Sequence, residues 1–291
     1  MMTKHNKRII YPALSVLIPC IFGIVGMVRN NVSPVIWMQN PLAILLLTFA
    51  GFFVLKCKLR YNYKAIVLTS IVLLGMTFLG PDMDGVHRWL GLSFFTLNIS
   101  AMVVPITIIA LYRLIVGKQI AISMVGTAVI AFLLFLQPDA SQLLAFSLPM
   151  IVLLLKSDVS KITTCGLSGI LLFLTAKSWS SLDTLQPVDY VEGVLTMLRE
   201  LSIVLYIAGL AALFWIPICF LVFGKEKNRN ECTAIALYYL LMVLSTFAGS
   251  FPVPFMGYGI SPILGFYAAV IWLIDEDKNQ RVQAAGHHLK I

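Results

Sequence analysis

Residues 120–155 read IAISMVGTAVIAFLLFLQPDASQLLAFSLPMIVLLL, and Asp139 is the single charged residue in this stretch. Two continuous apolar runs flank a Gln-Pro-Asp break. Each run approaches the roughly 20 apolar residues that a helix needs to cross the hydrocarbon core of a bilayer. The stretch therefore predicts a pair of transmembrane helices joined by a tight turn.

The same pattern continues along the whole chain of 291 residues, of which 59% are hydrophobic and 12% are charged. A soluble domain carries about 25% charged residues, because its surface must be wetted. We therefore predict an all-α integral membrane protein with one polytopic domain over residues 1–291. The ten predicted transmembrane helices span residues 9–28, 37–55, 64–80, 95–116, 119–137, 140–155, 161–178, 200–223, 232–250 and 260–274.

The net charge of +8 comes from basic residues whose positions follow the pattern of membrane topology. Of the 21 Lys and Arg residues, 17 fall at the termini or in every second loop, as the positive-inside rule requires of cytoplasmic segments. The other loops hold Arg29, Arg88, Lys177 and Arg199. This bias predicts that both termini are cytoplasmic. It also argues against a phosphate-binding face for nucleic acid, so we expect membrane lipid and no nucleic acid as a partner.

Two motifs lie at predicted helix ends on the outer side. In the Arg-Trp motif (residues 85–90), Arg88 beside Trp89 either binds a phosphate or extends to a lipid headgroup, and taken alone the second interpretation is favoured. In the Gln-Pro-Asp motif (136–139), Pro138 restricts Gln137 and ends the helix. Asp139 then suits the N-cap of the next helix, which predicts a structural role for this motif.

Two further motifs fall in later outer loops. The acidic loop motif (186–192) places Asp189 and Glu192 among bulky apolar residues, and partial desolvation there would raise a carboxyl pKa towards values useful in a general base. A solvated acid or a helix cap remains the alternative. The Pro/Gly segment (251–262) cannot form a regular helix, so it is either an ordinary turn or buried backbone at a site.

Taken together and in this order, the four motifs resemble the SEDS family (shape, elongation, division and sporulation). Members carry Arg-Arg-Trp, Gln-Pro-Asp, Thr-Asp-Phe and Pro-Leu-Pro-Phe-Ile-Ser-Tyr-Gly segments. Arg88 and Trp89 match the first, residues 137–139 the second, Asp189 the third, and residues 252–261 follow the fourth without a gap. The resemblance covers about residues 80–275 and includes the ten-helix topology.

The resemblance implies a membrane glycosyltransferase that polymerises lipid II at the outer face of a bacterial cytoplasmic membrane, for cell wall synthesis, cell shape or division. It implies a class B penicillin-binding protein as partner. It makes Asp189 the catalytic residue, either as a base for the acceptor hydroxyl or as a ligand of Mg²⁺ or Mn²⁺. The residues expected to bind substrate are Arg88, Trp89, Lys177, Pro254, Tyr258 and Ser261.

The sequence also departs from the family pattern. The loop between Lys177 and Asp189 is short, the family's acid at the start of the fourth helix is missing from residues 98–101, and Met197 and Leu198 replace paired glutamates. Two other functions therefore stay open. One is a flippase or transporter, which broken helices fit but the scarcity of ionisable residues in mid-helix does not. The other is a non-catalytic scaffold for the penicillin-binding protein.

Overall fold

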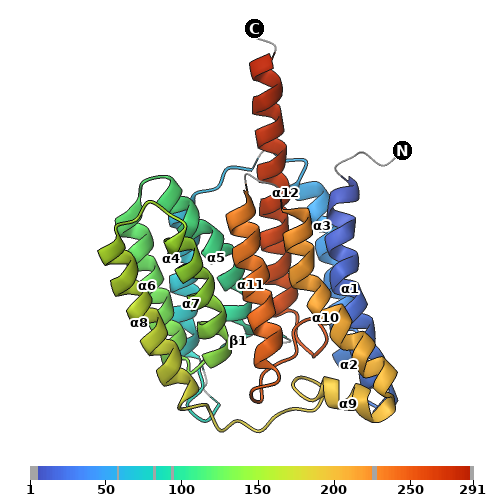
Figure 1. The fold of residues 1–291 in the computed structure, drawn as a ribbon. Coiled ribbons are helices and arrows are strands. Elements are labelled where there is room, and N and C mark those ends of the chain that lie inside the picture. The colour runs from blue at the N-terminus through green and yellow to red at the C-terminus, as the bar shows by residue number, and fades with distance from the viewer. Residues whose placement is uncertain (1–5, 58, 81–82, 93–94, 225–227, 289–291) are drawn as a thin grey trace.

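The structure, a computed structural model, describes residues 6–57, 59–80, 83–92, 95–224 and 228–288. Long helices pack side by side in one bundle, and a two-stranded sheet lies near one of its ends (Figure 1). The elements are α1 (Asn6–Arg29), α2 (Pro34–Trp37), α3 (Gln39–Val54), α4 (Tyr63–Met76), the 3-10 turn η1 (Thr77–Leu79), β1 (Trp89–Leu92), β2 (Phe95–Asn98), α5 (Ile99–Val116), α6 (Ile120–Leu136), α7 (Ala140–Leu155), α8 (Lys161–Trp179), α9 (Val194–Leu201), α10 (Ile203–Phe223), α11 (Arg229–Ser245) and α12 (Ser261–His288).

The outer surface of the bundle is apolar. Ile162 is 88% exposed, Val35 74% and Phe173 69%. Apolar surface on this scale is rare on a monomer in water, whereas a helix whose backbone is internally bonded can present it to lipid. The spans long and apolar enough to cross a membrane are Ile9–Arg29, Pro34–Val54, Ile99–Val116, Lys161–Trp179 and Ile203–Val222, with shorter apolar helices at Tyr63–Leu79, Ile120–Leu136 and Ala140–Leu155. The chain is a membrane-embedded helical protein.

Each of the ten predicted helical ranges overlaps with a helix of the described chain. The start of α1 and the end of α12 lie at the same end of the bundle, here called the terminal end (Figure 1). The opposite end, where α1 finishes and α12 begins, is called the site end. Termini on one side agree with an even number of crossings. That all ten helices cross the membrane, and that the termini are cytoplasmic, stay predictions.

Two helices, α5 and α10, begin later than predicted, and both differences trace to a capping residue. Residues 95–98 form strand β2, which pairs antiparallel with β1 from Trp89↔Asn98 to Leu92↔Phe95. The Asn98 side chain accepts the backbone N–H of Ala101 at 3.0 Å and so starts α5 at Ile99. Likewise, Ser202 accepts the N–H of Val204 and separates the short α9 from α10.

The later boundaries also differ from the prediction. Helix α11 ends at Ser245, because the glycines and prolines that follow cannot continue it. Helix α12 continues to His288, well past the predicted residue 274. The prediction stopped there because the apolar run stops, but α12 is a helix that extends beyond its apolar part (Figure 1).

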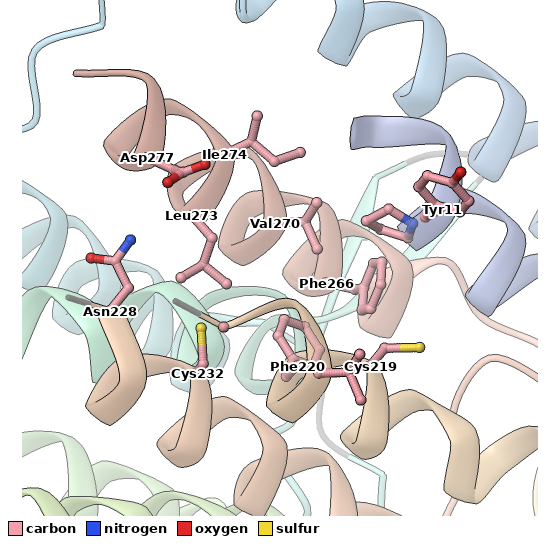
Figure 2. Close-up of a pocket in the computed structure, with 13 residues that line it drawn as sticks. Tyr11, Cys219, Phe220, Asn228, Cys232, Phe266, Val270, Leu273, Ile274 and Asp277 are labelled. Carbon is pink, nitrogen blue, oxygen red and sulfur yellow. The ribbon is translucent and has the colours of Figure 1, made fainter. Parts of the chain in front are cut away.

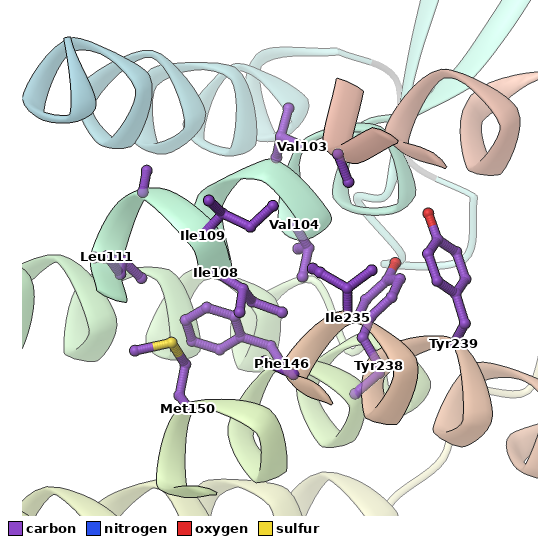
Figure 3. Packing of buried hydrophobic residues seen from close by; sticks show 14 of the residues in the cluster. Val103, Val104, Ile108, Ile109, Leu111, Phe146, Met150, Ile235, Tyr238 and Tyr239 are labelled. Atoms are coloured by element: carbon purple, nitrogen blue, oxygen red, sulfur yellow. The ribbon is translucent and has the colours of Figure 1, made fainter. Parts of the chain in front are cut away.

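The core is centred on α5, of which 78% is buried. Figure 3 shows Val104 and Ile108 of α5 meeting Phe146 of α7 and Ile235 of α11, and all four side chains are fully buried. Val104 and Ile108 are four residues apart, so they lie on one face of the helix. The packing of α4, α7, α11 and α12 around α5 fixes the position of the loops that meet at the site end.

At the terminal end, Arg113 of α5 joins the same helices through charge. Its guanidinium lies 2.9 Å from the Glu231 carboxylate of α11 and 3.5 Å from that of Glu276 of α12, and it donates to Asn228 at 3.0 Å. The ring of Trp272 lies 4.8 Å from its Cζ. A partly buried arginine needs such partners to offset its desolvation, so this cluster closes the terminal end of the bundle.

Candidate active site at the site end of the bundle

Arg88, which immediately precedes β1, is buried with a relative exposure of 5%. Its guanidinium donates to the backbone carbonyl of Pro138 and to the carboxylate of Asp183, and its Nε lies 3.8 Å from Asp139 Oδ2. Its Nε–H has no hydrogen-bond partner among the described residues. Arg88 therefore points into the protein. The interpretation that it extends to a lipid headgroup is wrong, because groups from two other loops hold it inside.

Asp139 occupies the N-cap of α7 and is 2% exposed. Its carboxylate accepts the N–H of Gln142 at 3.3 Å, the hydroxyl of Ser141 at 3.1 Å and that of Ser100, on α5, at 2.9 Å. Asp139 is thus both a cap and part of the surroundings of Arg88.

Gln137 and Pro138 fix the position of this turn. Gln137 follows the last residue of α6 and is fully buried. Its amide donates to the Leu74 carbonyl at 3.1 Å and to the Thr77 hydroxyl at 2.8 Å. Pro138 supplies the carbonyl that Arg88 binds. The Gln-Pro-Asp motif therefore bonds to the end of α4 on one side and to Arg88 on the other.

Asp189 lies in a tight turn between α8 and α9. The Val188 carbonyl accepts the N–H groups of Val191 and Glu192 at 2.8 and 2.9 Å, and the Glu192 carboxylate accepts the Val188 N–H at 2.8 Å. Gly193 closes the turn, where a Cβ would lie 2.8 Å from the Asp189 carbonyl oxygen. The Asp189 side chain is exposed and makes no hydrogen bond or ion pair within the described residues. Its carboxylate is therefore free to meet a ligand.

The partial burial expected in the acidic loop is found at Glu192, whereas the Asp189 side chain is exposed. Glu192 is half-buried, and burial raises its pKa above the ordinary 4.5, while the Val188 N–H and Arg88 act in the opposite direction. Asp183 adds to the rise by repulsion. Glu192 is thus within electrostatic range of both members of the Arg88–Asp183 pair, which connects the acidic loop to the Arg-Trp motif.

This shift predicts a pH dependence of stability. Because the pKa of Glu192 is higher in the folded than in the unfolded state, its protonation favours folding below pH about 4.5, and this contribution is lost as pH rises through the raised pKa. Melting temperatures of the wild type should therefore fall, relative to those of Glu192→Gln, between pH 4.5 and neutrality. Glu200→Gln, an exposed acid on α9, is the control and should keep the wild-type slope. Parallel curves for wild type and Glu192→Gln would contradict the assignment.

The Pro/Gly segment is buried beneath this turn rather than exposed as an ordinary outer loop. Val253 N–H donates to the Val191 carbonyl at 3.1 Å, and Tyr258 N–H donates to that of Tyr190 at 2.8 Å. From the other side, the buried Asn40 of α3 donates to the Gly257 carbonyl at 2.8 Å. Irregular backbone is tolerated at membrane depth only with such partners. These bonds join the acidic loop to the body of the bundle.

Gly257 allows this close approach, because an added Cβ would collide with the Val191 carbonyl oxygen. Backbone cannot rotate away as a side chain does, so Gly257→Ala must push the acidic loop off the Pro/Gly segment. We expect a loss of about 1–3 kcal/mol of stability, measured as a lower melting temperature. Gly169→Ala on α8 is the matched control, since nothing lies within 4 Å of its added Cβ. Equal melting temperatures for the two variants would refute the packing described.

The structure brings most of the predicted substrate-binding residues to the site end, where they differ in burial and in the groups that they contact. Trp89 is half-buried, with its ring 6.0 Å from Arg88 Cζ. The ring of Tyr258 meets that of Tyr190 edge to face at 6.0 Å, and the Ser261 hydroxyl accepts the Asn98 N–H at 2.9 Å. Pro254 is buried inside its segment, so it supports the backbone. Lys177 is exposed on the last turn of α8.

Sequence reasoning missed three polar residues of this site. Asp183 lies outside the four motifs, yet it is the partner of Arg88. Asn40 and Ser100 were hidden inside predicted apolar helices. A polar side chain in an apolar run was the available signal, since such a group is retained where it makes hydrogen bonds. Across the described residues, no group of three or more His, Cys, Asp or Glu side chains converges, so no metal ligand set is assigned around Asp189.

The sequence matches no family profile and no curated protein. Solved structures do match. RodA, the rod shape determining protein of Thermus thermophilus, is 17% identical, with 91% of this chain and 94% of RodA covered at a TM-score of 0.57; a point mutant of RodA gives 0.58 over 95% of its length. A chain from a peptidoglycan synthase complex, described as coordinating polymerization and crosslinking, is 16% identical over 91% of this chain and 96% of that one, with a TM-score of 0.66.

This chain has the RodA fold. The resemblance to the SEDS family, which rested on four short motifs, is therefore confirmed at the level of the fold. The fold also explains why motifs so far apart in the sequence matter together. In this chain each lies at the site end, and hydrogen bonds connect the Arg-Trp motif to the Gln-Pro-Asp motif and the acidic loop to the Pro/Gly segment.

Proposed function

We propose that this chain is a cell wall glycosyltransferase of the SEDS type, which polymerises lipid II at the outer face of a bacterial cytoplasmic membrane. The RodA fold supports a role in peptidoglycan synthesis. One observation carries the assignment to the site. The turn that holds Asp189 is bonded through its backbone to the buried Pro/Gly segment, while the Asp189 carboxylate itself stays exposed. A rigid turn that presents a free carboxylate is what a general base requires.

In this proposal, Asp189 accepts the proton of the acceptor sugar hydroxyl. The acceptor oxygen forms a bond to the anomeric carbon of the donor, and the bond from that carbon to the pyrophosphate breaks. The departing pyrophosphate gains negative charge, which a nearby guanidinium stabilises. Asp189 is at the surface where a sugar in the aqueous phase and a lipid in the outer leaflet can both arrive.

Arg88 is the group we assign to the pyrophosphate. It is held rigidly, and its Nε–H remains without a hydrogen bond among the described residues. Its present partner, Asp183, belongs to the same loop as Asp189. A phosphate oxygen would replace the Asp183 carboxylate as the partner of the guanidinium, because both are oxygen anions that a guanidinium binds in the same geometry. Substrate arrival and the position of the acidic loop would then be coupled.

We further propose a class B penicillin-binding protein as partner, supported by the likeness to a chain from a synthase complex described as coordinating polymerization and crosslinking. The test is polymerisation of lipid II by the purified protein in liposomes, alone and with that partner, with and without a metal chelator. Glycan strands are expected from the wild type. Transfer of lipid II across the bilayer without strands would support a flippase, and neither activity from folded protein with its partner would support a scaffold.

A further inference from the structure

A cavity of ≈ 440 Å³ lies at the terminal end of the bundle, far from Asp189, where α1 begins, α10 ends, α11 begins and α12 passes between them (Figure 2). Its wall along α12 runs from Phe266 to Asp277. At a rise of about 1.5 Å per residue, these two residues lie about 16 Å apart along the helix. The cavity is therefore a long, narrow slot, and none of the proposed glycosyl-transfer residues lines it.

The lining of the slot changes character along its length. Phe220 of α10 and Phe266, Val270 and Leu273 of α12 make its deeper part apolar (Figure 2). Polar side chains, Asn228 and Asp277, lie at its terminal end. An apolar interior with polar groups at one end fits an amphiphile rather than water, because a buried water needs several polar partners around it.

The rim of the slot faces the lipid phase. Tyr11 of α1 and Val222 of α10 both line the cavity, and they are 55% and 65% exposed. Their neighbours on the same helices, Leu14 and Ile218, are 48% and 43% exposed, so the bundle surface around the rim is apolar. A ligand would therefore enter the slot from within the bilayer, whose interior consists mainly of the acyl chains of lipids.

The width of the slot decides between a lipid chain and a protein helix. A helix with side chains is at least about 10 Å wide. The walls of the slot stand too close together to admit one, since Phe220, Phe266 and Val270 are only 5%, 1% and 4% exposed. A single methylene chain is narrow enough, and it would restore the dispersion contacts that an empty apolar cavity lacks.

We propose that this slot is a lipid-binding site, which takes one acyl chain of a phospholipid from the leaflet on the side of the termini and places its headgroup beside Asn228 and Asp277. The proposal is independent of glycosyl transfer. It adds a ligand that binds at the opposite end of the protein from Asp189, between the first helix and the last three long helices. Occupancy would bring α1 and α10 into contact with α12 through the chain.

The test uses the full protein in vesicles of phosphatidylethanolamine and phosphatidylglycerol that contain a phosphatidylethanolamine with a diazirine in mid-chain, because its ammonium group can pair with the Asp277 carboxylate. After illumination, crosslinked peptides are mapped by mass spectrometry. Crosslinks are expected at Phe220, Val270 or Leu273, at levels comparable with the lipid-facing Val204. Labelling of the slot no stronger than that of Ile108, which is fully buried in α5, would overturn the proposal.

A paired variant tests the slot directly. Val270 is 4% exposed and points into the cavity, so Val270→Phe fills it (Figure 2). Overlap between the added ring and a bound acyl chain should lower crosslinking at the slot by about tenfold. A tenfold weaker binding corresponds to about 1.4 kcal/mol, which is within the range of an overpacking cost. Val204→Phe adds the same ring on the lipid-facing side of α10 and should change nothing. Equal slot labelling in wild type and folded Val270→Phe would contradict the proposal, and the wild-type map still decides if Val270→Phe does not fold.

Discussion

Replacing Asp189 by asparagine is expected to lower the rate of lipid II polymerisation by about 10²–10⁴-fold, the contribution of a positioned general base. The amide has nearly the shape of the carboxylate but cannot accept the proton of the acceptor hydroxyl. The side chain is exposed and makes no hydrogen bond or ion pair within the described chain, so its loss should leave folding unchanged. Strand length on gels, together with the melting temperature, measures both effects.

Asp158→Asn is the matched control for this experiment. Asp158 lies in the loop between α7 and α8, at the terminal end, and its side chain is 94% exposed beside Lys118 at 3.5 Å. The same change of charge is made there, far from the acidic loop. Its rate should equal that of the wild type. Full polymerisation by Asp189→Asn would remove Asp189 from the chemistry, while the RodA fold and the lipid slot would be unaffected.

The fold was largely predictable because one physical signal dominates it. Apolar runs such as residues 120–155 must be helical in lipid, where each backbone group needs a partner within its own segment. The errors fall where side chains or loops override hydropathy. Asn98 ends an apolar stretch by capping, and α12 continues as a helix after its apolar residues stop. Neither boundary is visible in a hydropathy pattern.

The site was predictable only in part. The motifs drew attention to Arg88, Asp139 and Asp189 as candidates, but they did not indicate which other residues these side chains and loops contact. Arg88 and Asp183 are separated by 95 positions in the chain, and nothing in the local sequence of either indicates the other. Asn40 binds the Gly257 carbonyl across 217 positions. Such pairs depend on which loops the bundle brings to one end, so they require the tertiary structure.

These long-range bonds indicate how the acidic loop is held. It is fixed at two points, by the backbone bonds of Tyr190 and Val191 to the Pro/Gly segment and by the ion pair of Asp183 with Arg88. The first attachment consists of backbone hydrogen bonds between the two segments. The second is an ion pair that another anion can replace. The part of the loop around Asp183 is therefore the part that a pyrophosphate would release.

Replacing Arg88 by methionine is expected to destabilise the protein by about 3–5 kcal/mol, because the buried Asp139 carboxylate and the partly buried Asp183 carboxylate lose their compensating charge. Methionine keeps much of the side-chain volume, so the loss reports charge rather than a cavity. Arg29→Met, at an exposed arginine at the end of α1, is the control and should change stability little. Unfolding free energies from denaturant titration in mixed micelles measure both.

A double-mutant cycle then separates the Arg88–Asp183 pair from the rest of the site. Asp183→Asn removes one of the two charges that Arg88→Met leaves unpaired, so the double variant should be more stable than the sum of the single losses predicts. The expected coupling is about 1–3 kcal/mol. Strict additivity would show that the pair contributes nothing in the folded protein. Asp183 would then not hold the acidic loop, and a pyrophosphate could bind Arg88 without releasing it.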